Sequence, residues 1–87
     1  MRRRYYFFGR VQGVGFRYRA YYIANQLGLG GWVKNCEDGS VEMEIEGPEE
    51  LIEQLIQRLQ DDAYIRIDNM SYKSIPEQGE TAFNYGD

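Results

Sequence analysis

The sequence predicts an α+β fold in which two helices cover one face of an antiparallel sheet. Two segments carry apolar residues at helical spacing, and two strand-like runs joined by a turn lie between them. Another strand-like run precedes the first helix, and one more follows the second. The chain has 87 residues, close to the smallest size at which one hydrophobic core suffices, so we expect a single domain over residues 1–87.

The first strand and the first helix are predicted from aromatic clustering followed by helical spacing. Residues 4–11 have the aromatic and β-branched bias of a strand. Residues 16–27 place an apolar stripe on one helical face, formed by Phe16, Ala20, Ile23, Ala24 and Leu27. Gly28 fits the position just after the helix, where a left-handed conformation is needed.

The next two strands form a predicted hairpin. Residues 32–35 are a short strand, and Asp38 and Gly39 supply the turn between it and the next strand. In residues 41–46, apolar side chains alternate with three glutamates. This alternation predicts one buried face and one wet, acidic face.

The second helix is predicted to begin near Pro48, with two acidic residues in its first turn. Its apolar stripe consists of Leu51, Ile52, Leu55, Ile56 and Leu59. In the strand that follows, strict alternation would place residues 65 and 67 on one side of the sheet and residues 70 and 72 on the other. A bulge near Asp68 and Asn69 would bring all four to the same side. A polar connection then leads to a short final strand containing Phe83 and Tyr85.

This order, β-α-β-β-α-β, is the split β-α-β or ferredoxin-like arrangement. The fold hosts RNA-binding domains, metal chaperones and enzymes, so the function must be argued from a site.

The composition excludes several classes of chemistry. The chain has no histidine, which rules out Ser-His-Asp catalysis and imidazole acid–base catalysis. With a single cysteine, Cys36, a structural zinc site and an internal disulfide are not expected, and a reducing, cytoplasmic location is the default. No apolar run approaches the ~20 residues of a membrane span. The net charge of −4 argues against nucleic acid or an anionic membrane as partner, and we interpret the basic run at residues 2–4 as a solvated flank.

Three glycines cluster between the first strand and the first helix, at Gly9, Gly13 and Gly15. Glycine reaches positive φ at little cost, so the peptide N–H groups of such a loop can converge on one anion. The helix that follows adds its own free N–H groups, and Arg17 in its first turn adds a fork of donors suited to phosphate. Glycines before a helix are a weak signal alone, but together with Arg17 they predict a cradle for a small phosphorylated ligand.

The available side chains restrict the reaction to one that needs no protein acid or base. Asn35, at the end of a strand, could orient a water molecule by its amide. An acyl phosphate suits such a site, because its leaving carboxylate has a pKa of about 4 and departs unprotonated. The phosphate itself, with a second pKa of about 6, could accept the proton of the water.

The string Gly-Arg-Val-Gln-Gly-Val-Gly-Phe-Arg over residues 9–17 resembles the signature of the acylphosphatase family. The resemblance extends to Gly-Trp-Val-Lys-Asn at residues 31–35, to the turn at residues 38–42 and to the second helix. In that family the loop amides and the signature arginine bind phosphate, and the asparagine holds the attacking water. The resemblance therefore implies catalytic roles for Arg17 and Asn35. It implies substrate binding by the loop residues Val11, Gln12, Gly13, Val14, Gly15 and Phe16.

Three other functions remain open from the sequence. The chain could be a binding module that keeps the cradle without turnover, although the presence of both Arg17 and Asn35 argues against it. It could be an RNA-binding sheet, although the glycine–aromatic motif lies in a loop and the glutamates of residues 41–46 would repel RNA. Acylphosphatase-like modules also begin larger hydrogenase-maturation carbamoyltransferases, for which we expect a chain of this length to be too short.

The expected partners follow from the acylphosphatase resemblance. They are a small acyl phosphate as substrate and inorganic phosphate as product, with no cofactor, no metal, no nucleic acid and no membrane. We expect a monomer. The chain departs from the family at its periphery, with Asp61 and Asp62 after the second helix and an unusual final strand, which concerns edge-strand packing rather than the site.

Overall fold

The computed structural model describes residues 1–85 and arranges them as five strands and two helices. Their order along the chain is β1 (Arg2–Arg10), α1 (Phe16–Gln26), β2 (Gly30–Asn35), β3 (Val41–Glu46), α2 (Glu49–Gln60), β4 (Arg66–Ile75) and β5 (Phe83–Tyr85). Every predicted element is present, with ends that differ by a few residues from the prediction. Within residues 1–85 no helix is long and apolar enough to cross a bilayer.

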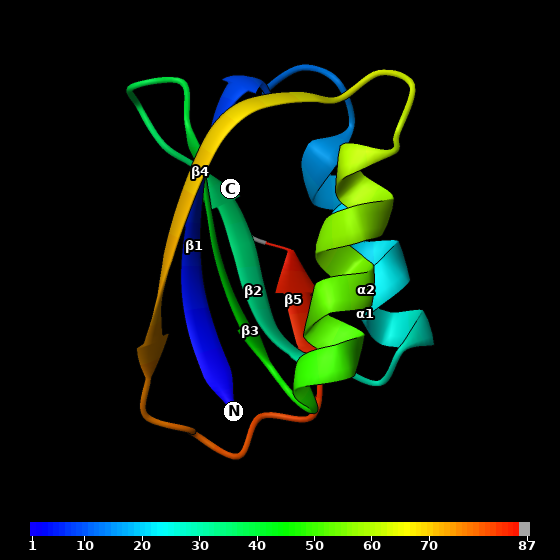
Figure 1. Cartoon of the computed structure of the whole chain (residues 1–87), viewed down its shortest axis with the longest axis vertical. Helices are drawn as coiled ribbons and strands as arrows, with labels where there is room; N and C mark the ends of the chain where they lie inside the picture. The colour runs from blue at the N-terminus through cyan, green and yellow to red at the C-terminus, as the bar shows by residue number, and fades with distance from the viewer. Residues whose placement is uncertain (86–87) are drawn as a thin grey trace.

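The strands form one sheet in the order β4-β1-β3-β2-β5, and both helices lie on the same face of it (Figure 1). The predicted ferredoxin-like α+β fold is therefore confirmed. One detail of the prediction needs correction, because β5 runs parallel to β2, with Tyr85 opposite Val33, and the sheet is mixed rather than wholly antiparallel. The physical reason is the connection over residues 76–82, which carries the chain from the β4 edge past the strand ends to the opposite edge (Figure 1).

The predicted bulge in β4 is also confirmed. Phe8 of β1 lies opposite Asn69, but the next residue, Gly9, lies opposite Ile67, so Asp68 is the extra residue. Gly9 has φ +131°, and a Cβ there would collide with the backbone of β4. The bulge thus needs glycine at this position in β1, just before the chain leaves the sheet.

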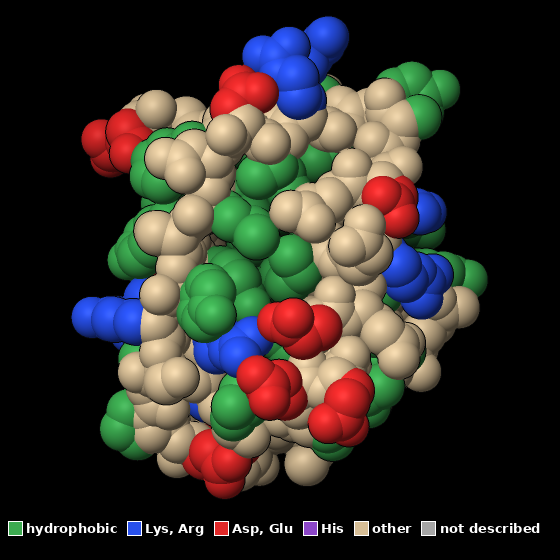
Figure 2. All heavy atoms as spheres, viewed as in Figure 1, with side chains coloured by type: hydrophobic (Ala, Val, Ile, Leu, Met, Phe, Trp, Pro, Cys, Tyr) green, Lys and Arg blue, Asp and Glu red, His purple; other side chains and the backbone are tan. Residues whose placement is uncertain are grey.

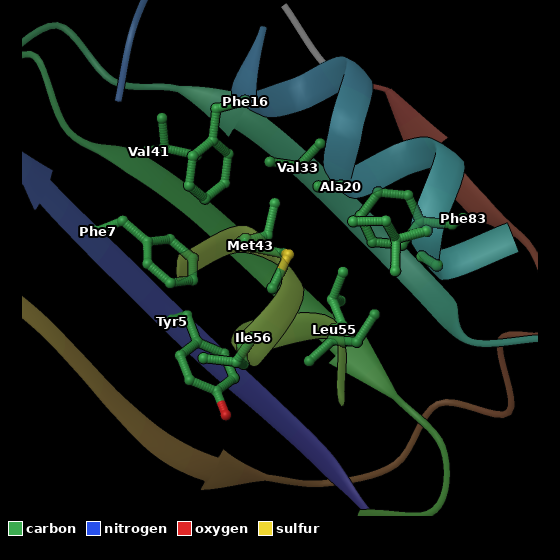
Figure 3. Packing of buried hydrophobic residues seen from close by; sticks show 14 of the residues in the cluster. Tyr5, Phe7, Phe16, Ala20, Val33, Val41, Met43, Leu55, Ile56 and Phe83 are labelled. Atoms are coloured by element: carbon green, nitrogen blue, oxygen red, sulfur yellow. The ribbon is translucent and has the colours of Figure 1, made fainter. Parts of the chain in front are cut away.

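A hydrophobic core between the sheet and the helices fixes both ends of the glycine loop. Figure 3 shows Phe7 of β1, Val41 of β3 and Phe16 of α1 around one end of this core. The ring centroids of Phe7 and Phe16 are 4.9 Å apart, and both side chains are buried. The strand before the loop and the helix after it are therefore packed against each other.

The other face of the sheet differs from the prediction. Arg2 is 1% exposed and Glu44 3% exposed, so residues 2–4 are not a solvated flank and β3 has no wet acidic face. The cause is strand register, since Arg2 lies opposite Glu46 and Arg4 opposite Glu44. Arg2 donates from Nε to Glu44 at 2.9 Å and from a terminal nitrogen to Glu46 at 3.0 Å. Ion pairs within the protein therefore take the place of the solvent contacts that the alternating pattern of residues 41–46 predicted for this face.

The connection between β4 and β5 completes the burial of these charges. The backbone N–H groups of Gln78 and Gly79 each donate to the Glu46 carboxylate at 2.8 Å. Glu80 adds an ion pair to Arg2 at 2.7 Å. The connection therefore rests on the charged network, and this contact sets where β5 can begin.

Arg3 points to the helix face, where it joins β1 to α2. Its terminal nitrogens donate to Glu49 at 2.7 Å and to Glu53 at 2.8 Å, and its guanidinium lies 4.6 Å from the centroid of the Tyr72 ring. Figure 2 shows this side of the molecule, with a strip of hydrophobic side chains between β4 and α2 and charged groups at one end of the strip.

The departure after α2 is accommodated, whereas residues 86–87 of the unusual final segment lie outside the described residues. Asp61 caps the end of α2 and accepts a hydrogen bond from Gln57 at 3.0 Å, and Asp62 forms an ion pair with Arg19 of α1 at 3.0 Å. Phe83 anchors β5 in the core with 3% exposure.

Candidate active site

The glycine loop, residues 11–15, leaves β1 and turns directly into α1. Gly13 and Gly15 both have positive φ, +73° and +81°, and Gly15 is the N-cap residue of α1. No side chain caps this helix, and its first backbone bond runs from the Arg19 N–H to the Gly15 carbonyl at 2.9 Å. By helix geometry, the N–H groups of the first turn have no intrahelical acceptor and carry the positive end of the helix dipole. The loop thus presents amides, and no side chain within residues 1–85 caps the helix start.

A small cavity of about 100 Å³ lies against this loop. It is lined by Val11, Gly13, Gly15, Phe16, Arg17, Asn35 and Tyr85. This space is far smaller than the roughly 300–1,000 Å³ of pockets that enclose a drug-sized ligand. A phosphoryl group with a water molecule is of this scale, and an acyl chain would have to lie outside.

Two predicted loop residues do not line the cavity with their side chains. Gln12 donates from its amide nitrogen to the carbonyls of Cys36 at 2.7 Å and Ser40 at 2.8 Å. It braces the loop against the β2–β3 hairpin, so only its backbone can face a ligand. Val14 packs partly against the core and lines a neighbouring hollow.

Asn35 reaches the cavity from the last position of β2. Strands β1 and β2 both run antiparallel to β3, so their carboxyl ends lie at the same end of the sheet (Figure 1). The side-chain oxygen Oδ1 of Asn35 is buried, and no donor within residues 1–85 lies at hydrogen-bond distance from it. A buried acceptor without a donor is costly unless water or a ligand supplies one. Asn35 therefore has an acceptor available for a water O–H.

Arg17 and Tyr85 form the remaining wall. The Arg17 guanidinium lies over the Tyr85 ring, 5.0 Å from its centroid, and Tyr85 contacts Tyr21 edge-on at 6.1 Å between centroids. Besides this ring contact, Arg17 makes a second non-covalent interaction. The sequence predicts Tyr85 in the final strand but gives it no role in the site, because it is the parallel pairing of β5 with β2 that brings this residue to the cavity.

Among residues 1–85, the polar side chains that line the cavity are Arg17, Asn35 and Tyr85, and no carboxylate or thiol of that part of the chain lines it. Such a site can bind and orient a phosphoryl group and a water molecule, and electrostatics and positioning are its available means of catalysis.

Comparison with known proteins decides the family. The family model described as Acylphosphatase matches residues 3–85. The chain belongs to the acylphosphatase family. It is an enzyme of that family, and the reaction is the hydrolysis of acyl phosphates.

Two proteins with this name match over most of their length. The acylphosphatase of Picrophilus torridus is 49% identical over 61 residues, which are 70% of this chain and 75% of that protein. The crystal structure of the acylphosphatase from Bacillus subtilis is 36% identical, with a TM-score of 0.86 over 94% of this chain and 93% of that one.

The same fold occurs inside a larger protein. The structure of HypF from T. kodakarensis is 39% identical with a TM-score of 0.83, over 99% of this chain but only 12% of that one. The fold therefore occurs both in proteins of about this length and within a longer chain.

In the structure, the motif behind the RNA-binding alternative lies off the sheet. The glycine–aromatic motif lies at the loop and helix start rather than on a strand, and the arginines of β1 and glutamates of β3 on the open sheet face neutralise each other.

Proposed function

We propose that residues 1–87 form one catalytic domain that cleaves the carboxyl–phosphate anhydride of small acyl phosphates into a carboxylate and inorganic phosphate. In this proposal the amides of residues 11–16 and Arg17 bind the phosphoryl group, and Asn35 orients the attacking water. One observation carries the proposal. The loop, Arg17 and Asn35 come from three separate elements and converge on one cavity of about 100 Å³.

The phosphoryl oxygens lie against the loop amides and the first turn of α1. The dipole of α1 favours negative charge at that point, and the planar guanidinium of Arg17 offers two parallel hydrogen bonds. As the bond to the leaving group lengthens, charge spreads over the equatorial oxygens, where these donors already point.

The attacking water donates a hydrogen bond to Oδ1 of Asn35, which supports in-line attack on phosphorus from the β2 side of the loop. The P–O bond to the acyl oxygen breaks, and its electron pair leaves with the carboxylate. Since that carboxylate has a pKa of about 4, no general acid is required. The proton of the water passes to a phosphoryl oxygen, so the products are the carboxylate and inorganic phosphate.

The test is an assay with benzoyl phosphate and with glycerol 3-phosphate, an alkyl phosphate whose alkoxide would need protonation. We expect hydrolysis of the first and none of the second. Arg17→Ala should lower kcat/KM by about 10³-fold or more, on the scale of other arginines that stabilise a transferring phosphoryl group. Arg17→Lys should recover little, because a point charge lacks the planar fork.

Arg19→Ala is the matched control, since Arg19 lies on the same helix but pairs with Asp62 instead of lining the cavity. It should retain turnover. An Arg17→Ala variant that keeps most of the wild-type rate while folded by circular dichroism would overturn the proposed roles.

We further propose that the enzyme works as a monomer in the cytoplasm, without a cofactor or metal. The single cysteine, Cys36, is unpaired, which suits a reducing compartment. The net charge of −4 supports the absence of nucleic acid and membrane partners. Analytical ultracentrifugation would test the monomer.

A further inference from the structure

A second, larger hollow of about 410 Å³ adjoins the phosphate-sized cavity. It is lined by Arg10, Gly13, Val14, Ala63 and Tyr64. Gly13 lines both spaces, so no side chain separates them at this residue. A ligand held in the small cavity can therefore extend into the hollow past the loop.

The hollow lies on the side of the loop away from Asn35. Asn35 ends β2, Arg10 ends β1, and β3 lies between these strands, so β1 and β2 are about 10 Å apart across the sheet at ~4.8 Å per strand. Asn35 is in register with Phe7, and Arg10 lies three residues further along β1. Figure 1 shows the connection from α2 to β4, which carries Ala63 and Tyr64, at this same end of the sheet.

In-line displacement places the attacking water and the leaving group on opposite sides of phosphorus. With the water on Asn35, the acyl group departs toward β1 and β4, where the hollow lies. A still larger groove, lined by Tyr21, Tyr22 and Phe83 among others, flanks β5 instead. That groove is on the same side as Asn35, which is the wrong side for a leaving group.

The chemistry of the hollow points to an anion. Arg10 lies opposite Arg66 across the β1–β4 pair. Arg66 is held by Asp68 at 2.9 Å, whereas no carboxylate among residues 1–85 forms an ion pair with Arg10. Tyr64 is 77% exposed and offers an aromatic face beside this cation.

We propose that this hollow is the acyl subsite, and that Arg10 and Tyr64 select acyl phosphates whose acyl part carries a second negative charge. The aliphatic or aromatic part of the acyl group lies between Val14 and Tyr64, and its distal carboxylate binds Arg10. This inference rests on the proposed roles of Arg17 and Asn35, because they set the direction in which the acyl group leaves.

The experiment compares kcat/KM for 4-carboxybenzoyl phosphate with that for its neutral 4-carbamoyl isostere and for benzoyl phosphate. The wild type should prefer the carboxylate substrate by about three- to fivefold, the scale of one exposed ion pair. Arg10→Gln should abolish that preference and leave benzoyl phosphate unchanged. Added salt should reduce the preference in the wild type, because exposed charges are screened.

Arg66→Gln is the matched control, an arginine at the same end of the sheet that lies outside the hollow. It should keep the preference. Tyr64→Ala should raise KM for all the aromatic substrates, whereas Tyr22→Ala, in the β5 groove, should not.

The outcomes separate this inference from the proposed function. If benzoyl phosphate is cleaved but Arg10→Gln and the wild type prefer the carboxylate substrate to the same extent, the proposed acyl subsite is contradicted and the proposed function stands. If Tyr22→Ala rather than Tyr64→Ala weakens substrate binding, the acyl group lies in the β5 groove and the inference is overturned. Failure to cleave any of these substrates would instead contradict the proposed function.

Discussion

The Arg17 guanidinium lies 5.0 Å from the centroid of the Tyr85 ring, so the last strand of the sheet supports the arginine of the phosphate cradle. Arg17 belongs to the first turn of α1, and Tyr85 to a short edge strand that pairs with β2. The ring restricts where the guanidinium can go, and a restricted donor loses less entropy when it binds phosphate.

Tyr85→Ala should therefore weaken phosphate binding without abolishing it. A cation–π contact at a partly exposed site contributes about 0.5–1 kcal/mol, so KM should rise by roughly two- to fivefold. Tyr85→Phe keeps the ring and should stay near the wild-type KM. Steady-state kinetics with benzoyl phosphate would measure both, and a Tyr85→Phe variant as impaired as Tyr85→Ala would show that the hydroxyl matters instead.

Asn35→Ala should separate catalysis from binding. The side chain is proposed to hold the water rather than the phosphate, so affinity for inorganic phosphate should stay nearly constant. Turnover should fall by about 10²- to 10³-fold, the scale for removing one preorganised hydrogen-bonding group. Isothermal titration with phosphate and single-turnover kinetics would measure the two effects.

The neighbouring variant Lys34→Ala controls for disturbance of the strand, since Lys34 is exposed on β2. Equal losses of affinity and turnover in Asn35→Ala would make Asn35 a phosphate-binding residue. No loss of either would mean that the water is held elsewhere.

Gly13→Ala and Gly28→Ala form a matched pair, because their φ angles are +73° and +71° and neither has an atom within 4 Å of an added Cβ. Both variants should lose about 1–2 kcal/mol of unfolding free energy from the left-handed backbone. Only Gly13→Ala should weaken phosphate binding, by about tenfold, as expected for about one lost hydrogen bond to a strained loop. Urea unfolding and phosphate titration would check this. A similar loss of affinity in Gly28→Ala would indicate a general effect of instability.

Arg2→Met should destabilise the fold strongly although Arg2 lies at the opposite end of β1 from the glycine loop. It removes one partner each of Glu44 and Glu46, which remain buried. Removing one partner of a buried ion pair lowers the free energy of unfolding by about 3 kcal/mol or more. Arg66→Met, which breaks only an exposed pair with Asp68, should change stability by less than about 0.5 kcal/mol. Denaturant unfolding that gave equal losses for the two would contradict the role of the network.

The same network predicts a loss of stability in acid. Burial alone would raise the pKa of Glu44, but hydrogen bonds and charges from Arg4 and Arg2 outweigh it and hold that pKa below the ordinary value of 4.5. A carboxyl with a lowered folded pKa stabilises the fold above its unfolded pKa, and this contribution disappears as the pH falls through the folded value. Unfolding free energy should therefore be retained at neutral pH and decline below about pH 4.5.

Urea unfolding from pH 7 to pH 3 would measure this decline. The variant Glu44→Gln should be less stable at pH 7 and should lose less on acidification than the wild type. An identical pH profile in Glu44→Gln would assign acid sensitivity to other carboxyl groups.

The sequence by itself determined the elements and named most of the residues that line the cavity. Apolar residues at helical spacing in residues 16–27 and alternation in residues 41–46 report which face packs against the hydrophobic core, because these periods follow from local backbone geometry. The glycines at positions 13 and 15 likewise mark positive φ locally, as the structure shows. The string at residues 9–17 was specific enough to indicate the family.

Only the tertiary structure decided the partners across space. The pairing of β1 with β3 placed arginines opposite glutamates and turned an apparent wet face into a buried ion network. The parallel pairing of β5 with β2 brought Tyr85 to Arg17, and the folding of the loop turned Gln12 away from the cavity toward Cys36 and Ser40. These outcomes depend on strand register and on contacts between distant segments, and a local pattern of polar and apolar residues carries no information about which charge will lie opposite which.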